Sequence, residues 1–368
     1  MKIDRIEIRT IRLPLREPFV ISSGAWTDRS VFLVSLHAGG LTSWGEVVAA
    51  EDPSYSYETT ETAWHVIRDY IAPAIVGKDF DSPAEMIGAA GWVRGHRMAK
   101  AGLEMAAWDL WARSHGVSLA QELGGGREAV AVGVSIGIQP DDATLLGKVE
   151  RHLEEGYRRI KLKIKPGRDV KMLQAVRGRF PEAKLMADAN SAYSLADADH
   201  LAALDDLDLM MIEQPLAHDD IRDHARLQAR LATPVCLDES IRSAADARLA
   251  LELGACRIIN IKPGRVGGFG ESTAIHDLCL EAGVAVWCGG MLESGIGRAH
   301  NVALATLPGF TLPGDISESR RYWEEDVVTP EFEMDGGFMP VPKGPGMGVE
   351  PRLDRIESLE LRREVFTG

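Results

Sequence analysis

The sequence predicts an α/β protein built as a (β/α)8 TIM-type barrel, with an N-terminal α+β capping domain that the C-terminal segment completes. Three observations favour this fold class. The chain has 368 residues, which is more than one ordinary domain requires. Its middle part repeats short β-branched strands and amphipathic helical stretches, and three consecutive predicted strands end in an acidic residue.

The capping domain is predicted at residues 1–125. It begins with alternating strands at 3–11 and 30–37, and a helical stretch follows at 98–113. Three consecutive glycines at 124–126 precede a change of rhythm along the chain. We therefore expect the second domain to begin at this break.

The barrel is predicted at residues 126–317, with helical segments such as 146–155 and 194–204 between its strands. Eight βα units at intervals of roughly 25 residues fit a closed barrel better than an open sheet. Residues 318–368 are irregular and rich in Pro and Gly, and we expect them to return to the capping domain. The eight predicted strands are 129–138, 159–165, 184–190, 209–216, 234–240, 256–262, 284–290 and 310–316.

A doubly wound fold with a dinucleotide cofactor is the main alternative for an alternating pattern of strands and helices. Such a fold places a glycine fingerprint after its first strand, where the backbone approaches the pyrophosphate. The nearest match is GRVGG at 264–268, and it lacks the spacing of that fingerprint. The sequence therefore argues against a dinucleotide cofactor.

The charge of the chain limits its partners. The formal net charge is −14 and the isoelectric point is near 5.2, so nucleic acid and anionic membrane surfaces are not expected partners. A small anionic substrate remains possible, because a bound cation and a few lysines can reverse the field inside one pocket.

The cysteines and the N-terminus bear on the compartment. Four cysteines, at 236, 256, 279 and 288, have neither metal-type spacing nor the density of a disulfide scaffold, so we expect reduced thiols in the core. The first residues alternate charged and apolar side chains, and no apolar run reaches the ~18 residues of a membrane span. We expect a cytoplasmic protein.

Acidic residues end three consecutive predicted strands: Asp188, Glu213 and Asp238, at intervals of 25 residues. Strand C-termini of a barrel form a ring at its catalytic face, so these acids are expected to lie side by side. Each alone is better explained as a helix cap or ion-pair partner. Together they predict a site for Mg²⁺, with Mn²⁺ also possible, because both ions prefer oxygen ligands.

Two lysines on the second predicted strand, Lys161 and Lys163, are two residues apart and so point to the same side. The helices around a barrel need the apolar face, which sends both lysines into the lumen. Lys262 ends the sixth strand, opposite the second. A solvated lysine row at a sheet edge is the alternative, and a closed barrel has no such edge.

These residue types suggest removal of a proton next to a substrate carboxylate, with a cation stabilising the enolate. Lys163 and Lys262 are the candidate acid/base pair, and Lys161 is expected to tune Lys163. Burial, the neighbouring ammonium and the cation are expected to lower the lysine pKa values. Two bases on opposite faces allow racemisation or epimerisation, whereas one base allows β-elimination or cycloisomerisation, and the residues alone do not choose.

The motifs that carry these residues resemble the enolase superfamily, in its muconate-lactonizing-enzyme subgroup, over essentially the whole chain. They are KLK at 161–163, DAN at 188–190, IEQP at 212–215, LDES at 237–240 and NIKPGRVGG at 260–268. The resemblance implies the same three magnesium ligands and the same three lysines. It also implies a homo-oligomer that acts on a small carboxylate substrate.

Within the subgroup, the segments 94–105, 289–301 and 312–316 look most like o-succinylbenzoate synthases and N-succinylamino acid racemases (N-acylamino acid racemases). This likeness implies a lyase of menaquinone biosynthesis, an isomerase, or both. Dipeptide epimerases typically carry an Asp-x-Asp pair after the seventh strand, where this chain has Met291-Leu292-Glu293. That difference argues against the epimerases.

Further candidates for the site are weaker. Substrate contacts are expected from strand parity, from the segment after the seventh strand and, by resemblance, from the capping loop: Ser135, Asn190, Met291, Leu292, Glu293, Phe19, Ser22, Trp26 and Tyr55. Glu239 is expected to contact a metal ligand or to begin the following helix. Arg265 is expected to lower the pKa of Lys262 or to hold a carboxylate. A muconate-type cycloisomerase or dipeptide epimerase remains the enzymatic alternative, and a non-catalytic metal-stabilised barrel is the alternative from another class.

Overall fold

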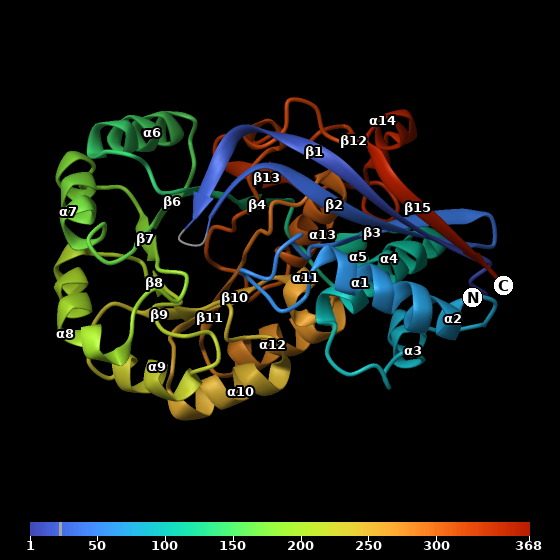
Figure 1. Cartoon of the computed structure of the whole chain (residues 1–368), viewed down its shortest axis with the longest axis horizontal. Coiled ribbons are helices and arrows are strands. Elements are labelled where there is room, and N and C mark those ends of the chain that lie inside the picture. The colour runs from blue at the N-terminus through green and yellow to red at the C-terminus, as the bar shows by residue number, and fades with distance from the viewer. Residues whose placement is uncertain (22–23) are drawn as a thin grey trace.

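The structure, a computed structural model, describes residues 1–21 and 24–368. Figure 1 shows two bodies side by side: a long antiparallel sheet with its helices, and a curved arrangement of short strands surrounded by helices. This arrangement confirms the predicted fold class.

The capping sheet has the strand order β15-β1-β2-β3 and is antiparallel. Its strands are β1 (Arg5–Ile21), β2 (Gly24–Ala38), β3 (Leu41–Val47) and β15 (Glu360–Thr367). The first two strands are much longer than the sequence pattern predicted. Because β15 pairs with β1, the C-terminal segment returns to the capping domain, and both chain ends lie together in Figure 1.

Helices of the capping domain cover one face of this sheet. They are α1 (Thr60–Val66), α2 (Ala72–Ile75), α3 (Pro83–Gly88), α4 (Arg97–His115) and α5 (Leu119–Glu122). Two glycines let α4 lie close to β3: a Cβ on Gly45 would lie 2.0 Å from the Gly102 carbonyl oxygen, and one on Gly102 would lie 2.4 Å from Val47. Larger residues at either position would push the helix away from the sheet.

The second body is a curled parallel sheet of seven strands in the order β11-β10-β9-β8-β7-β6-β5. Its strands are β5 (Gly133–Ile136), β6 (Arg159–Lys163), β7 (Leu185–Asp188), β8 (Ile212–Glu213), β9 (Val235–Leu237), β10 (Ile258–Ile261) and β11 (Ala285–Cys288). Its helices are α6 (Asp142–Glu154), α7 (Val170–Arg179), α8 (Ala198–Leu201), α9 (Ile221–Gln228), α10 (Ala244–Leu253), α11 (Pro263–Val266), α12 (Phe269–Glu281) and α13 (Gly295–Leu304).

The eighth predicted strand, at 310–316, is wrong as a regular strand. The segment makes only isolated parallel bridges, from Phe310 to Val286 on one side and from Gly314 to Val132 on the other. Pro313 has no N–H to donate and lies between the two bridges, so a continuous ladder cannot form there. The ring is therefore completed by an irregular segment instead of a strand.

Two other predictions need correction. The segment 129–138 is divided: β4 (Ala129–Ala131) pairs antiparallel with β13 (Phe338–Pro340), and only β5 joins the barrel sheet. The helix expected at 194–204 is a short α8 between two 3₁₀ turns. The C-terminal region also contains β12 (Val328–Thr329), β14 (Glu350–Pro351) and α14 (Leu353–Ser358).

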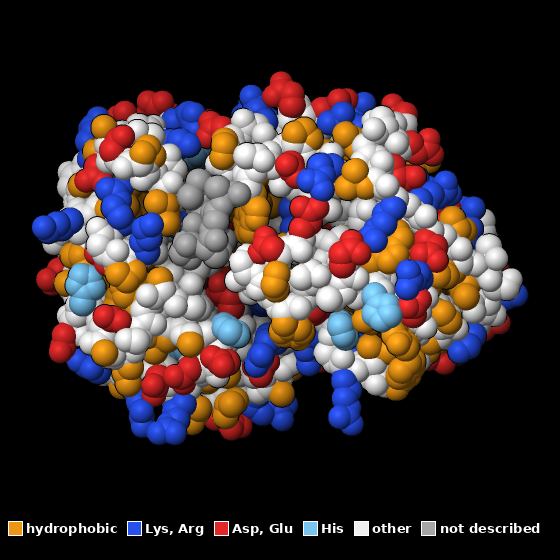
Figure 2. Space-filling model, in the orientation of Figure 1, with side chains coloured by type: hydrophobic (Ala, Val, Ile, Leu, Met, Phe, Trp, Pro, Cys, Tyr) orange, Lys and Arg blue, Asp and Glu red, His pale blue; other side chains and the backbone are white. Residues whose placement is uncertain are grey.

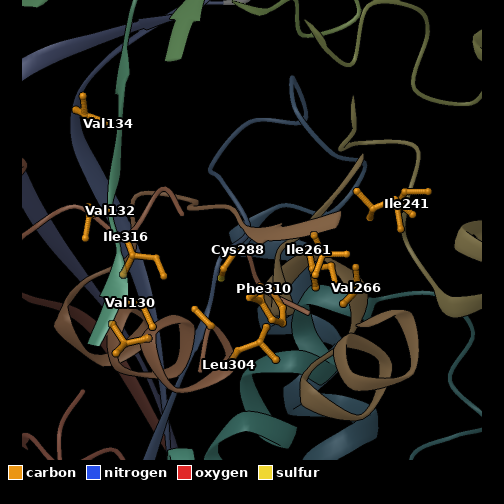
Figure 3. Packing of buried hydrophobic residues seen from close by; sticks show 14 of the residues in the cluster. Val130, Val132, Val134, Ile241, Ile261, Val266, Cys288, Leu304, Phe310 and Ile316 are labelled. Atoms are coloured by element: carbon orange, nitrogen blue, oxygen red, sulfur yellow. The ribbon is translucent and has the colours of Figure 1, made fainter. Parts of the chain in front are cut away.

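The apolar residues form two large cores, one between the strands and the barrel helices and one inside the capping domain. Figure 3 shows side chains of the first core, including Ile261, Cys288 and Phe310. A separate small cluster contains Met186, Met211, Cys236, Ile258 and Trp287 from β7 to β11. All four cysteines are buried and unpaired, as expected of reduced core thiols. In the described part of the chain, no helix combines the length and the apolar character that crossing a membrane requires.

Candidate active site

The carboxyl ends of β6 to β10 bring the predicted acids and lysines together. Lys163 lies opposite Asp188 in the sheet register, and Asp188 lies opposite Glu213. Asp238 directly follows β9, and Lys262 directly follows β10. Because parallel strands end at one rim, these side chains share that rim.

Lys161 is the most buried of the three lysines and is 3 % exposed. Its Nζ is 2.5 Å from Asp315 Oδ2, 3.1 Å from Glu213 Oε2 and 3.4 Å from Asp188 Oδ2. The ammonium also lies 5.0 Å from the centre of the Trp287 ring, within the range of a cation–π contact. Three carboxylates and an aromatic face therefore surround Lys161.

Lys163 extends toward the pocket from the same side of β6. Its Nζ donates to Asp188 Oδ2 and to Asn190 Oδ1, both over 2.6 Å. The Asn190 amide in turn donates to Glu239 Oε1 over 3.0 Å. Glu239 therefore supports Asn190, and through it Lys163.

Lys262 is held at the far side of the rim. Its Nζ donates to Asp238 Oδ2 over 2.8 Å and to the Tyr55 hydroxyl over 3.0 Å. Arg265 donates to the other oxygen of Asp238, and its remaining donors bind the carbonyls of Ile241 and Asn260. Arg265 thus holds the Asp238 carboxylate.

The charges at the rim shift the pKa values of these groups. Burial alone would raise the pKa of Asp188, but Lys163 and Lys161 outweigh it and hold the pKa below its usual range. Burial and the charge of Asp188 raise the pKa of Glu213. The expectation of lowered lysine values is wrong for Lys161 and Lys262: burial lowers each pKa, but the surrounding acidic groups outweigh it and raise both.

The three predicted metal ligands are not assembled into a formed cation site. Among the residues that the structure describes, no group of three or more His, Cys, Asp or Glu side chains is arranged to hold a metal ion. Asp188 and Glu213 come together, whereas both oxygens of Asp238 accept bonds from Lys262 and Arg265. The donor chemistry still fits a divalent cation, because three buried carboxylates end adjacent strands and two of them repel each other.

The sequence interpretation missed an ion pair of Arg159, which lies on β6 two residues before Lys161. Arg159 is fully buried, donates to Asp315 Oδ1 over 2.7 Å and stacks 4.9 Å from the Trp287 ring centre. A Cβ on Gly133 would lie 2.5 Å from the Arg159 guanidinium carbon, so only glycine fits beside it. Strand parity was an available signal, because Arg159 precedes Lys161 by two residues.

A pocket above the rim contains most of the remaining candidates. Predicted residues that line it are Phe19, Trp26, Tyr55, Ser135, Lys161, Lys163, Asn190, Lys262, Met291, Leu292 and Glu293. Arg29, Arg298, Asp315 and Tyr322 also line it and were not predicted. Glu239 and Arg265 line a neighbouring cavity, which shares Tyr55 with this one. Ser22 lies outside the described residues.

Left-handed backbone follows three of the strand ends, and Asn190, with φ of 43°, comes two residues after β7. Gln214, directly after Glu213, has φ of 39°, and Leu292, after β11, has φ of 58°. Residues of these types rarely adopt this region, and such conformations cluster at functional sites. The Gln214 side chain accepts hydrogen bonds from the backbone N–H groups of Asp238 and Ser240, at 3.0 and 3.2 Å. The turn therefore fixes the backbone that carries Asp238.

The surface around the site has mixed charge. On the face drawn in Figure 2, acidic and basic side chains are interspersed over both bodies. The converging lysines and acids of the rim are instead buried beneath the capping domain.

Comparisons with known proteins identify the family. Residues 145–355 match the family described as enolase C-terminal domain-like, and residues 5–124 match the N-terminal domain of mandelate racemase and muconate lactonizing enzyme. The chain belongs to the enolase superfamily. Members of this superfamily are enzymes that generally depend on a divalent metal, so the chain is an enolase-superfamily enzyme.

Two curated relatives are similar over their whole length. An o-succinylbenzoate synthase of Geobacillus stearothermophilus is 52% identical over 367 residues, which cover 100% of this chain and 98% of the relative. An N-succinylamino acid racemase of Thermus thermophilus is 53% identical over 361 residues, which cover 98% of each chain. This enolase-superfamily chain is thus about equally similar to relatives with two different activities.

A solved structure supports the same family. An enolase-superfamily member from Listeria innocua superposes with a TM-score of 0.97 at 41% identity, covering 100% of this chain and 99% of that one. The capping domain and the barrel of this enzyme therefore have the arrangement found in the superfamily.

Proposed function

We propose that this enzyme removes the proton next to a substrate carboxylate and acts as an o-succinylbenzoate synthase, an N-succinylamino acid racemase, or both. Lys163 and Lys262 are the proposed acid/base pair. Lys161 is the proposed neighbour whose positive charge tunes Lys163. The synthase activity would give the chain a part in menaquinone biosynthesis in the cytoplasm.

The observation that carries the proposal is the placement of two lysines around one pocket. Lys163 ends β6 and Lys262 follows β10, four positions away in the strand order, and both line the same cavity. A substrate whose α-carbon lies between them has an amine on each face. A proton can then leave toward one lysine and return from the other, or leave toward one lysine while a β-substituent departs.

The charges at the rim support a divalent cation as the cofactor. Five acidic and five basic side chains make up a buried cluster: Asp188, Glu213, Asp238, Glu239 and Asp315, with Arg159, Lys161, Lys163, Lys262 and Arg265. A lysine must be neutral to accept a proton, and a bound carboxylate adds one more negative charge. Both changes make the site more negative, and a divalent cation would offset the added negative charge.

Asp188, Glu213 and Asp238 are the residues that would hold this cation, proposed as Mg²⁺ or Mn²⁺. The cation would supply positive charge to the substrate carboxylate as negative charge develops on it. The cation would compete with Lys163 and Lys262 for the oxygens of Asp188 and Asp238.

The relatives supply the substrate class. Both named activities act on a molecule with a succinyl group, and the relatives share about half of their residues with this chain over its full length. Two amines around one pocket are compatible with both dehydration and racemisation, so the proposal includes both reactions.

The test is proton NMR of the purified enzyme with Mg²⁺ in deuterated water. N-succinyl amino acids and the o-succinylbenzoate precursor are supplied in separate tubes. Dehydration with little racemisation supports a dedicated synthase, and α-deuteration with loss of chirality supports a racemase. Absence of both reactions contradicts the proposed substrates and directs the search to dipeptides and lactone precursors.

A further inference from the structure

A second cavity of about 330 Å³ lies outside the candidate active site. Three segments form its walls: β1 before its hairpin turn, with Arg16 and Glu17; helix α6, with Arg151 and His152; and the segment at 318–321. Arg320 and Arg321 bring the number of guanidinium groups in its lining to four. Clusters of arginine are typical of sites for oxyanions.

The acidic residues of this cavity already have cationic or polar partners. Glu17 accepts from Lys148 over 2.9 Å, and Glu318 accepts from Arg320 Nε over 2.6 Å. Glu155 lies 2.7 Å from the His152 ring. The carboxylates therefore do not neutralise every guanidinium group in the cavity.

Arg321 takes part in none of these pairs. Among residues 1–21 and 24–368, no carboxylate forms an ion pair with it, and its only hydrogen bond is from Nη2 to the Ser135 carbonyl, at 3.4 Å. Its Nε is buried and has no partner. The Arg321 side chain is half-buried, and an anion beside it would accept from the unpartnered Nε and offset the positive charge.

His152 supplies a second unsatisfied group to the same cavity. The residue is 1 % exposed, its Nδ1 faces Glu155, and its Nε2 is buried without a hydrogen-bond partner. Arg321 lines the same cavity as this ring. Arg151, one residue earlier on α6, forms a single ion pair with the described residues, a long contact of 3.7 Å to Glu17.

We propose that this cavity binds a small oxyanion such as a phosphate group, held mainly by Arg321 and Arg151 with His152 beside them. Arginine recognises such groups through paired N–H donors, and each of the two guanidinium groups has donors that no carboxylate satisfies at close range. This site goes beyond the proposed function and does not depend on it.

Three residues next to the lining of this cavity line the active-site pocket. Phe19, two residues after Glu17 on β1, lines that pocket, and so does Tyr322, the residue after Arg321. Ser135 lines it as well, and its carbonyl accepts from Arg321. An anion that draws α6 and the segment at 318–321 together would hold these three walls in place, so it should strengthen substrate binding.

Calorimetric titration with inorganic phosphate, in a buffer free of oxyanions, tests the binding step without any substrate. The wild type should bind phosphate, and Arg321→Met should weaken the binding by about tenfold or more, because the main charge-assisted donors are lost. Arg151→Gln, at a side chain 47 % exposed, should also weaken it and is not expected to disturb folding. Arg321→Lys should keep part of the affinity.

Arg226→Gln on α9 is the matched control, since it removes an exposed arginine that is paired with Asp223. It should bind phosphate like the wild type. Sulfate should compete with phosphate, whereas chloride at equal ionic strength should not. Absence of phosphate binding, or equal binding by the wild type and Arg321→Met, would overturn the proposed site.

Steady-state kinetics with and without phosphate test the coupling. The KM of the wild type should fall when phosphate is added. The KM of Arg151→Gln should be the same with and without phosphate. An unchanged wild-type KM at saturating phosphate would overturn the coupling. Failure of the proposed activity is a separate result, because phosphate binding is measured calorimetrically on the same preparations.

Discussion

Lys163 and Asn190 are joined by a hydrogen bond of 2.6 Å from Nζ to Oδ1. Asn190 is itself fixed from two sides: its N–H donates to Asp188 Oδ1 over 3.1 Å, and its side-chain amide donates to Glu239 over 3.0 Å. Its φ of 43° lies in the left-handed region, which Asn tolerates better than most residues. Asn190 therefore sets the direction from which Lys163 faces the pocket.

Replacing Asn190 with Gly removes this amide and keeps a backbone that tolerates positive φ. We expect kcat/KM to fall by about 10–100-fold, because a base without its orienting partner samples unproductive positions. Steady-state kinetics of α-proton exchange measure the effect. Ser191→Gly is the control, since Ser191 has φ of 63° and does not line the pocket, and its activity should stay near that of the wild type. Equal rates for both variants would contradict this role.

Tyr55 is expected to position Lys262. Its hydroxyl accepts from Lys262 over 3.0 Å and lies 3.3 Å from Asp238, and its ring centre is 4.8 Å from the ammonium. Tyr55→Phe keeps the ring but removes the hydroxyl, so kcat should fall by about tenfold while thermal stability changes little. Tyr57→Phe, at a residue 58% exposed, should have no effect on either quantity. Full activity of Tyr55→Phe would show that the hydroxyl has no such role.

His300 should make the protein sensitive to acid. It is fully buried in α13, neither ring nitrogen has a hydrogen-bond partner among the described residues, and burial lowers its pKa to about 3. As the pH falls below about 6.5, the unfolded chain takes up a proton that the folded protein does not, so the free energy of unfolding decreases until the pH reaches about 3.

The variant His300→Leu should therefore lose less stability than the wild type between pH 7 and pH 5. The expected difference is about 2 kcal/mol, at about 1.4 kcal/mol for each pH unit below 6.5. Urea unfolding at the two pH values measures it. Parallel losses in both proteins would exclude His300 as the cause.

Glu104 on α4 joins the capping domain to the barrel. Its carboxylate accepts from the N–H groups of Phe269 and Gly270, at 2.7 and 2.9 Å, and from the Trp108 indole at 2.9 Å. Glu104→Ala leaves these donors without their acceptor, which should lower the free energy of unfolding by about 2–4 kcal/mol. Glu104→Gln keeps one acceptor oxygen and should cost less. Chemical denaturation measures the free energy of unfolding of both variants. An equally small decrease in the two would show that Glu104 does not join the two domains in this way.

The lysines and acids were predictable because they depend on local rules. Residues two apart on a strand share a face, which places Lys161 and Lys163 on the same side, and the ends of parallel strands share a rim, which brings Asp188 beside Glu213. The same rule applies to Arg159, which the sequence interpretation did not consider.

Other features depend on contacts that local patterns do not encode. The segment 310–316 has the apolar residues of a strand, but Pro313 prevents a continuous ladder. Tyr322 reaches the pocket only because the C-terminal region folds back against the barrel, and Arg298 reaches it from α13. The raised pKa of Lys262 likewise depends on Tyr55, which comes from the other domain.

The most direct test of the two-base account uses Lys163→Ala and Lys262→Ala with the separate D and L forms of an N-succinyl amino acid. Exchange of the α-proton in deuterated water is followed by proton NMR in the presence of Mg²⁺. The account predicts that each variant loses exchange with one enantiomer and that the two variants lose opposite enantiomers. Exchange of both enantiomers at the wild-type rate by either variant would contradict it.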